Sequence, residues 1–216
     1  MTRLTKSGTP TRTQTPTEGT NDRRQEILKL AAELFAQRGY EAVGVRQIAD
    51  AAGILAGSLY HHFPSKRDLY IEVHKAALAD AAAAIEREIA PLVDPWERLT
   101  AACRIHLGLQ VDPRSATLPL MSNLSTMSDD MRAHLVKDRD RFETIYKKLV
   151  AALPLRAGID RNVYRLCLLS LINAVPTWYR PTKMSVAEVA DQIVLIFRTT
   201  VSEAAPATKK AGVRNS

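Results

Sequence analysis

The stretch Gly44-Val-Arg-Gln-Ile-Ala-Asp-Ala-Ala-Gly53-Ile-Leu-Ala-Gly-Ser-Leu-Tyr-His-His-Phe63 decides how the first third of the chain folds. It predicts two short helices, over residues 44–52 and 56–63, because apolar residues recur in each at helical spacing. Gly53 breaks the first of them. Two short helices joined by a three- to four-residue turn that contains glycine have the spacing of a helix-turn-helix.

The second short helix combines small side chains at its start with aromatic side chains farther along. Small residues allow the N-terminus of a helix to approach base edges inside a DNA major groove about 12 Å wide. Leu59 and Phe63 lie four residues apart and are expected to face inward. The residues that would meet the groove are Ala56, Gly57, Ser58, Tyr60, His61 and His62.

The helices on either side of this motif are marked by apolar spacing and by caps. Residues 27–35 place apolar side chains on one helical face, and Gly39 is available to end that helix in a left-handed conformation. Ser65 and Asp68 form a capping box for a long helix expected over residues 66–89. Together these elements predict a DNA-binding domain over residues 21–70, from which the long helix leads onward.

The remaining sequence also predicts helices. Caps precede later helices at Asp94, Asp160 and Ser185, and the acids Asp129 and Asp130 after Ser128 mark the start of another. No convincing strand is present. The predicted fold class is therefore all-α, with about nine helices. The helix that follows Asp160 is apolar nearly all round, as expected of a helix buried on two sides. The last helix is expected to bury Val186, Val189, Ala190, Ile193, Ile196, Phe197 and Thr200.

The net charge of +7 does not by itself indicate nucleic-acid binding, because most of it lies near the chain ends. Residues 1–20 contribute +2 and residues 204–216 contribute +3, and both are expected to be disordered tails. The sequence has no run of about 18 apolar residues that would span a membrane, and no apolar N-terminal secretory signal. Cys103 and Cys167 lack metal-ligand spacing, which is typical of a protein of the reducing cytoplasm.

The motif and its surroundings resemble the signature of TetR-family repressors. The resemblance covers about 50 residues and rests on Gly39-Tyr40, Val45, Ile48-Ala49, Ala52-Gly53-Ile54, the run from Gly57 to Lys66, and Leu69. It implies a homodimer with a three-helix DNA-binding head and a six-helix body, residues 90–203, for ligand binding and dimerisation. It also implies a palindromic operator in double-stranded DNA as partner, and release by a small hydrophobic effector.

The same resemblance assigns roles to residues of the motif. Tyr60 and Lys66 match residues that hold phosphates in the family. Lys66 begins a helix, where a cation is unfavourable unless an external anion neutralises it. Arg46 matches a residue that meets the DNA backbone or the bases, although a solvated surface charge explains it equally well. The positions that face the bases in the family correspond to Ala56, Gly57, Ser58 and His61.

Two positions depart from the family pattern. Gly44 and Leu55 stand where Ser or Thr usually caps the second and third helices. Because leucine cannot accept a hydrogen bond through its side chain, the third helix is expected to begin without a side-chain cap, which lowers its stability by about 1 kcal/mol. His61 and His62 are adjacent and point about 100° apart on a helix, which disfavours a shared metal ion.

The effector site is harder to place. The segment Trp178-Tyr179-Arg180-Pro181, together with residues 53–55 and 58–63, is similar to the TetR subgroup that controls steroid and fatty-acid degradation and responds to acyl-CoA thioesters. The similarity implies an acyl-CoA effector, whose phosphates would suit Arg180. Ordinary core packing or capping explains every candidate as well. The candidate effector residues are His106, Leu120, Met121, Leu124, Met127, Phe142, Trp178 and Arg180.

Two other functions compete with a ligand-responsive repressor at the cytoplasmic nucleoid. A small helical enzyme would need catalytic residues, but the sequence shows no nucleophile elbow, Glu-x-x-His pair, phosphate loop or paired metal ligands. We therefore expect no catalytic site, cofactor or metal, and Cys103 with His106 is the one pair that an enzyme could use. A helical interaction protein with a head that no longer binds DNA is the second alternative, and the uncapped Leu55 is its best support.

Overall fold

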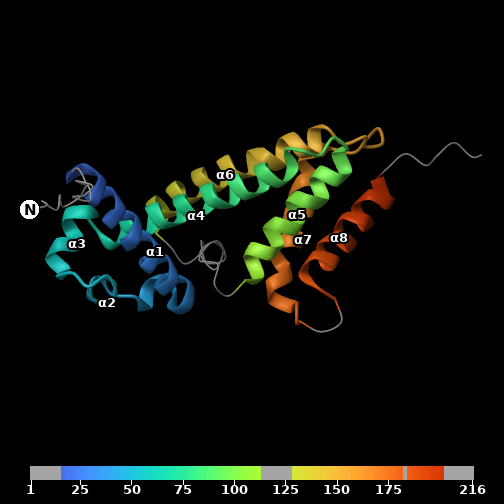
Figure 1. Cartoon of the computed structure of the whole chain (residues 1–216). Coiled ribbons are helices and arrows are strands. Elements are labelled where there is room, and N and C mark those ends of the chain that lie inside the picture. Colours follow the sequence, from blue (N-terminus) through green and yellow to red (C-terminus); the bar gives the residue numbers. More distant parts are fainter. Residues whose placement is uncertain (1–15, 113–127, 182–183, 202–216) are drawn as a thin grey trace, which may run out of the picture.

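The computed structural model describes residues 16–112, 128–181 and 184–201, and these ranges contain eight α-helices and no β-strand. The helices form two lobes that are joined by two long helices, which lie side by side (Figure 1). The predicted all-α fold is confirmed. The expected count was about nine helices, and residues 113–127 lie outside the described ranges.

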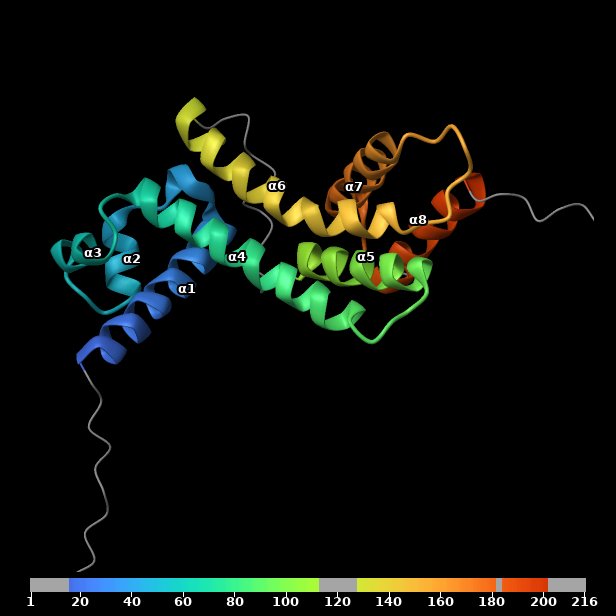
Figure 2. The same cartoon turned by 90° about the horizontal axis from the view of Figure 1, so that it is seen from above.

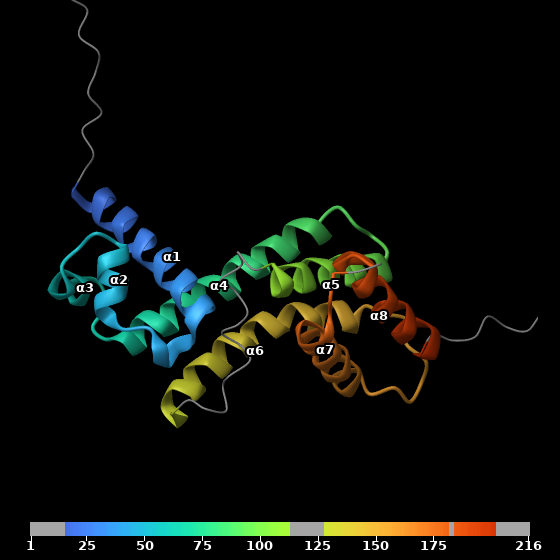
Figure 3. The ribbon, with the colours of Figure 1, turned by 90° about the horizontal axis from the view of Figure 1, so that it is seen from below.

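The N-terminal lobe, here called the head, is built from α1 (Pro16–Ala42), α2 (Val45–Ala51), α3 (Ala56–His62) and the first turns of α4 (Lys66–Ile89). A cluster of buried hydrophobic side chains forms its core and includes Ile27, Phe35, Ile48, Leu59, Phe63 and Leu69. Figure 3 shows α2 and α3 at the end of the molecule, away from the other lobe. This position leaves the helix-turn-helix accessible from outside.

Helix α1 differs from its prediction at both ends. It begins at Pro16, so it includes residues 16–20, which the sequence places in the N-terminal tail. Proline suits a first helical turn because its missing N–H would have no intrahelical partner there. Near the other end, Gly39 has φ 79° and ψ 162°, and one further turn reaches Ala42. The positive φ expected of Gly39 is confirmed, and it acts as a kink within α1.

The second lobe, here called the body, contains the C-terminal half of α4 with α5 (Pro95–Val111), α6 (Asp129–Ala151), α7 (Arg161–Trp178) and α8 (Val186–Val201). Its separate core includes Ile85, Leu99, Leu107, Tyr146, Leu168, Ile172 and Ala190. Viewed from above, α5, α7 and α8 gather at the end opposite the head (Figure 2). None of the helices in the described ranges combines the length and apolarity that crossing a bilayer requires.

Helices α4 and α6 both reach from one lobe into the other. Met131 and Leu135, in the first turns of α6, belong to the hydrophobic core of the head. Phe142, farther along the same helix, belongs to the core of the body. Arg67 of α4 also forms an ion pair with Asp130 of α6 at the head end. The two lobes are therefore connected by a pair of helices that are packed at both ends.

Side-chain caps begin four helices where the sequence predicts them. Ser65, Asp94 and Asp160 each accept a hydrogen bond from the backbone N–H three residues farther on, at 3.1, 2.8 and 2.8 Å. Ser185 and Glu188 form a reciprocal capping box, with N···O distances of 3.2 and 2.6 Å. These local bonds set the starts of α4, α5, α7 and α8.

One prediction about burial is wrong, and a second is not decided by the single chain. Ile196 of α8 is 55% exposed, because the buried stripe of that helix runs through Ala190 and Val194 and leaves Ile196 beside it. In α7, Leu166 and Leu171 are exposed, so the single chain covers one side of this helix, and burial of its second side stays a prediction. Thr200 lies among the residues whose side chains are not described.

Candidate DNA-binding surface and effector groove

A short hydrogen-bonded turn holds α2 and α3 in a fixed relation. Gly53 has φ 63°, a left-handed conformation that glycine adopts without strain. The Ile54 N–H donates to the Ala49 carbonyl at 2.9 Å, and the Leu55 carbonyl accepts from the Leu59 N–H at 3.3 Å. Because Leu59 is buried, α3 is fixed on its inner side and presents its other side to solvent.

The residues of α3 that were predicted to meet DNA lie on its solvent side or at its edges. Tyr60 is 52% exposed. Gly57 and His61 are exposed as well, while Ala56, Ser58 and His62 are partly buried. On the preceding helix, Arg46 is exposed. In the described part of the chain, no group of three or more His, Cys, Asp or Glu side chains is placed to hold a metal ion.

The two cap positions that depart from the family pattern, Gly44 and Leu55, differ in whether a side chain bonds to the start of the helix. The N–H of Gly44 donates to the Gln47 side chain at 2.8 Å, so α2 gains a side-chain bond from its own first turn. Leu55, at the N-cap of α3, makes no side-chain cap and is 80% exposed. The expected absence of a cap on α3 is confirmed.

Lys66, the first residue of α4, lies against the end of α1. Its Nζ is 4.2 Å from the centroid of the Tyr40 ring and donates to the Glu41 carbonyl at 3.5 Å. Tyr40 is itself held by the ring of Tyr70, at a centroid distance of 4.8 Å. An aromatic ring attracts a cation without neutralising its charge. The ammonium group is thus held in one place at the start of α4.

Two arginines of α1 brace the motif, and neither was predicted from the sequence. The Arg24 guanidinium lies 4.7 Å from the centroid of the Phe63 ring and 3.5 Å from the Glu72 carboxylate. Arg23 donates to the Ala52 carbonyl at the end of α2. The available signal was a pair of arginines just ahead of the apolar stripe of α1.

Among the predicted effector residues, His106 and Phe142 meet in the core of the body, with ring centroids 5.3 Å apart. The His106 Nδ1 lies 2.9 Å from the Tyr146 hydroxyl, which donates to the Ala102 carbonyl at 3.3 Å. In this arrangement Nδ1 carries the proton, and Nε2 accepts from the Gln110 amide at 3.1 Å. Burial lowers the pKa of His106 to about 4, so the ring is neutral at pH 7.

The other predicted effector residues do not join this cluster. Trp178 is 52% exposed at the end of α7. The exposed Arg180 guanidinium donates to the Tyr179 carbonyl at 2.8 Å. The structure therefore separates these surface residues from the buried pair. The remaining candidates lie outside the described residues and are Leu120, Met121, Leu124 and Met127.

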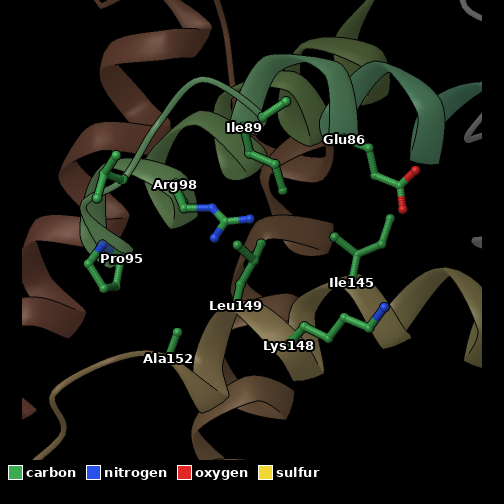
Figure 4. A pocket seen from close by; sticks show the side chains of 10 residues that line it. Glu86, Ile89, Pro95, Arg98, Ile145, Lys148, Leu149 and Ala152 are labelled. Carbon is green, nitrogen blue, oxygen red and sulfur yellow. The ribbon is translucent and has the colours of Figure 1, made fainter.

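A groove of about 400 Å³ opens between the C-terminal ends of α4 and α6 and the start of α5. Ile89, Ile145 and Leu149 line it as apolar walls. Figure 4 shows the Arg98 guanidinium between Ile89 and Leu149, with Lys148 at the edge. The Arg98 Nε atom is buried and has no hydrogen-bond partner. The groove thus combines apolar walls with the two cations and the carboxylate of Glu86.

A second cavity of about 220 Å³ continues along the seam between α4 and α6. Glu86 and Ile145 border both spaces, and Phe142 lines the second. Its α4 side includes the short side chains of Ala79 and Ala82, beside the longer ones of Lys75, Leu78 and Glu86. Neither space was predicted from the sequence, and for the second one the alanines of α4 were the available signal.

Two family models together match most of the chain. Residues 27–73 match a model described as bacterial regulatory proteins, tetR family. Residues 92–201, more than half of the chain, match the C-terminal domain described as tetracyclin repressor-like. The chain belongs to the TetR family.

Individual TetR proteins show how far the similarity extends. The HTH-type transcriptional repressor KstR2 of Mycolicibacterium smegmatis is 32% identical over 181 residues, which are 81% of this chain and 88% of that protein. KstR2 of Rhodococcus jostii is 56% identical over 64 residues, but this match spans only 30% of the chain and 31% of that protein.

Solved TetR structures share the fold. The ketosteroid transcriptional regulator KstR2 of Mycobacterium tuberculosis has a TM-score of 0.65 and 25% identity, and the match covers 85% of this chain and 97% of that one. The transcriptional regulator FadR of Bacillus subtilis, in complex with stearoyl-CoA, has a TM-score of 0.71 and 20% identity, with 80% and 96% covered.

Proposed function

We propose that the chain is a ligand-responsive transcriptional repressor that binds a palindromic DNA operator as a homodimer. The observation that carries this proposal is α3, held on its inner side by Leu59 and Phe63 and open to solvent on the other. A helix fixed in this way is suited to the major groove, while α2 braces it across the DNA backbone. The similarity to KstR2 repressors supports the same function.

Tyr60 and Lys66 are the proposed phosphate contacts. Phosphate contacts set the register of a protein on DNA, whereas contacts to base edges carry the sequence information. The Tyr40 ring orients the Lys66 ammonium without removing its charge, which suits it to this role. The remaining residues predicted at the interface would read bases or touch the backbone: Arg46, Ala56, Gly57, Ser58, His61 and His62.

The dimer is proposed to form through α7 and α8. Both helices pack one side into the core of the body and expose large apolar side chains on another, including Val163 and Leu166 of α7 and Leu195 of α8. Pairing with a second copy would bury them in a four-helix bundle. It would also set two α3 helices about 34–36 Å apart, in successive major grooves. Leu195→Arg should give the mass of one chain in light scattering, where the wild type gives two.

We propose an acyl-CoA thioester as effector, bound in the groove between α4, α5 and α6. Its acyl chain would lie against Ile89 and Leu149, and its phosphates would meet Arg98 and Lys148. A volume of about 400 Å³ lies in the range of small-molecule sites. FadR, which shares the fold, was solved with stearoyl-CoA. Arg180 is less suited to the phosphates, since its guanidinium donates to the backbone.

Effector binding would act on DNA through the two helices that border the groove. Both α4 and α6 continue into the head, where Met131 and Leu135 are buried and Arg67 pairs with Asp130. An effector that prefers a wider separation of α4 from α6 would shift the head and misplace the two α3 helices of the dimer. It can shift this equilibrium only by its difference in affinity for the two forms.

Selection of binding sites from random duplex DNA tests operator binding. We expect a palindrome to be enriched, with affinity that falls steeply as salt rises. Selection that enriches no palindrome contradicts the proposed function.

Titration of the operator complex with stearoyl-CoA, a short acyl-CoA and free CoA tests the effector. We expect release by an acyl-CoA and not by free CoA. Arg98→Gln should keep operator affinity and lose the response, and the control Arg87→Gln, exposed near the end of α4, should respond normally. A normal response of Arg98→Gln would place the effector elsewhere.

The proposal assigns no catalytic step to the chain and places it at the nucleoid of the cytoplasm, where operator DNA lies. The state of Cys103, which an enzyme could have used with His106, supports the absence of a catalytic step. Cys103 is fully buried, and burial raises its pKa to about 12, so the thiol stays protonated and is a poor nucleophile.

A further inference from the structure

Leu55 is a large apolar side chain that the fold leaves in water. It stands at the N-cap of α3 in an extended conformation, with φ −71° and ψ 144°, and is 80% exposed. A serine or threonine there would stabilise the helix through a side-chain hydrogen bond. In the described part of the head, Leu55 and Tyr60 are the exposed large apolar side chains. Folding of the head therefore gives no reason for a leucine at this position.

The backbone that carries Leu55 is held in place. The preceding Ile54 packs against the head core, and its N–H donates to the Ala49 carbonyl at 2.9 Å. The Leu55 carbonyl accepts from the N–H of Ser58 at 2.9 Å. On the other side, Gly57 has open space where a Cβ would stand. The leucine thus projects from a fixed turn, beside small residues that do not shield it.

We propose that Leu55 reads the C5-methyl group of a thymine in the major groove of the operator. The inference rests on the proposed function, in which the N-terminal end of α3 contacts base edges. Leucine has no hydrogen-bond donor or acceptor in its side chain. Among the groups that base pairs present in the major groove, the thymine methyl is the apolar one. Contact between the two removes apolar surface of both from water.

Replacement of single thymines by uracil in the selected operator tests this contact, because uracil lacks only the C5-methyl group. We expect one symmetry-related pair of positions at which uracil weakens wild-type binding, roughly four-fold per half-site for a group of methyl size. Leu55→Ala should bind the thymine and uracil operators equally well at these positions. Leu55→Met, which keeps an apolar contact, should retain a penalty for uracil.

Leu55→Ser separates the DNA contact from folding. Serine supplies the missing cap, so this variant should melt at a higher temperature than the wild type and still lose the discrimination between thymine and uracil. A wild type that binds its operator but tolerates uracil at every position overturns the role of Leu55 and leaves the proposed function intact. A uracil penalty that is unchanged in Leu55→Ala also overturns it. Failure to enrich any operator overturns the proposed function itself.

Discussion

The head and the body bury different kinds of side chain. The core cluster of the head is hydrophobic, and the residues proposed to bind DNA lie outside it. The body buries the polar side chains of His106 and Arg165 next to its apolar core, and its groove carries Arg98 and Lys148 between apolar walls. In the proposed function, selectivity for DNA would therefore depend on the surface of the head, whereas selectivity for the effector would depend on polar groups placed among apolar ones in the body.

Breaking the buried ion pair of the body should have the largest effect. The Arg165 guanidinium is buried, pairs with Glu143 and donates to Asn162 at 2.9 Å. Glu143→Ala leaves this cation buried without its main counter-ion, so the free energy of unfolding should fall by about 3–5 kcal/mol in urea denaturation. The double variant Arg165→Met/Glu143→Leu removes both charges and should recover most of the loss. An equal loss in the double variant would show that packing, rather than the unpaired charge, is responsible.

Acid should destabilise the body and its junction with the head through two neutral histidines. Burial lowers the pKa of His74 and of His106 to about 4, although Asp138 near His74 acts in the opposite direction. Between the unfolded pKa near 6.5 and the folded pKa, the unfolded chain binds more protons. The contribution of the neutral histidines to the free energy of unfolding is therefore fully present above pH 6.5. It is lost as the pH falls toward 4, by up to about 3 kcal/mol per histidine.

Unfolding free energies measured between pH 7 and pH 4 check this dependence. Neither ring nitrogen of His74 has a hydrogen-bond partner. His74→Leu should therefore be no less stable than the wild type at pH 7 and should show a shallower pH profile. A wild-type profile that stays flat from pH 6.5 to pH 4.5 would contradict the prediction.

Two glycines of the head should differ in their tolerance of alanine. Gly39, with φ 79° and ψ 162°, has a conformation that is essentially restricted to glycine, and Gly53 has a left-handed φ of 63°. No atom lies within 4 Å of an added Cβ at either site, so the backbone alone sets the cost. We expect Gly39→Ala to lower the free energy of unfolding by about 1–3 kcal/mol and Gly53→Ala by about 1 kcal/mol. Thermal denaturation of both variants measures the order, and the reverse order would refute it.

The smallest expected effect concerns one cation at the surface of the head. Lys66→Gln should weaken operator binding a few-fold and lower the slope of log affinity against log salt by about one unit per subunit. Binding isotherms at several salt concentrations measure both quantities. Arg87→Gln, in the body, removes the same charge and should change neither. An unchanged slope for Lys66→Gln would show that this lysine contacts no phosphate.

Features of the head that depend on neighbouring residues were predicted from the sequence, whereas features of the body that depend on several helices were not. The helix over residues 66–89, its cap at Ser65 and the turn at Gly53 were predicted because each depends on residues close together in the chain. The groove depends on three helices, and apolar periodicity does not reveal whether the side chains of Ile89, Arg98 and Leu149 leave a space between them. In the same way, the spacing that predicts the buried face of α8 does not show that Ile196 falls outside it.

The reach of α6 into the head has a consequence for exchanging parts between relatives. The two family models divide the chain between residues 73 and 92, within and after α4. A chimera joined there would take Met131 and Leu135, which are buried in the head core, from the parent that supplies the body. Each exchange would thus place two foreign side chains in the head, and a functional hybrid would need the first turns of α6 from the parent that supplies the head.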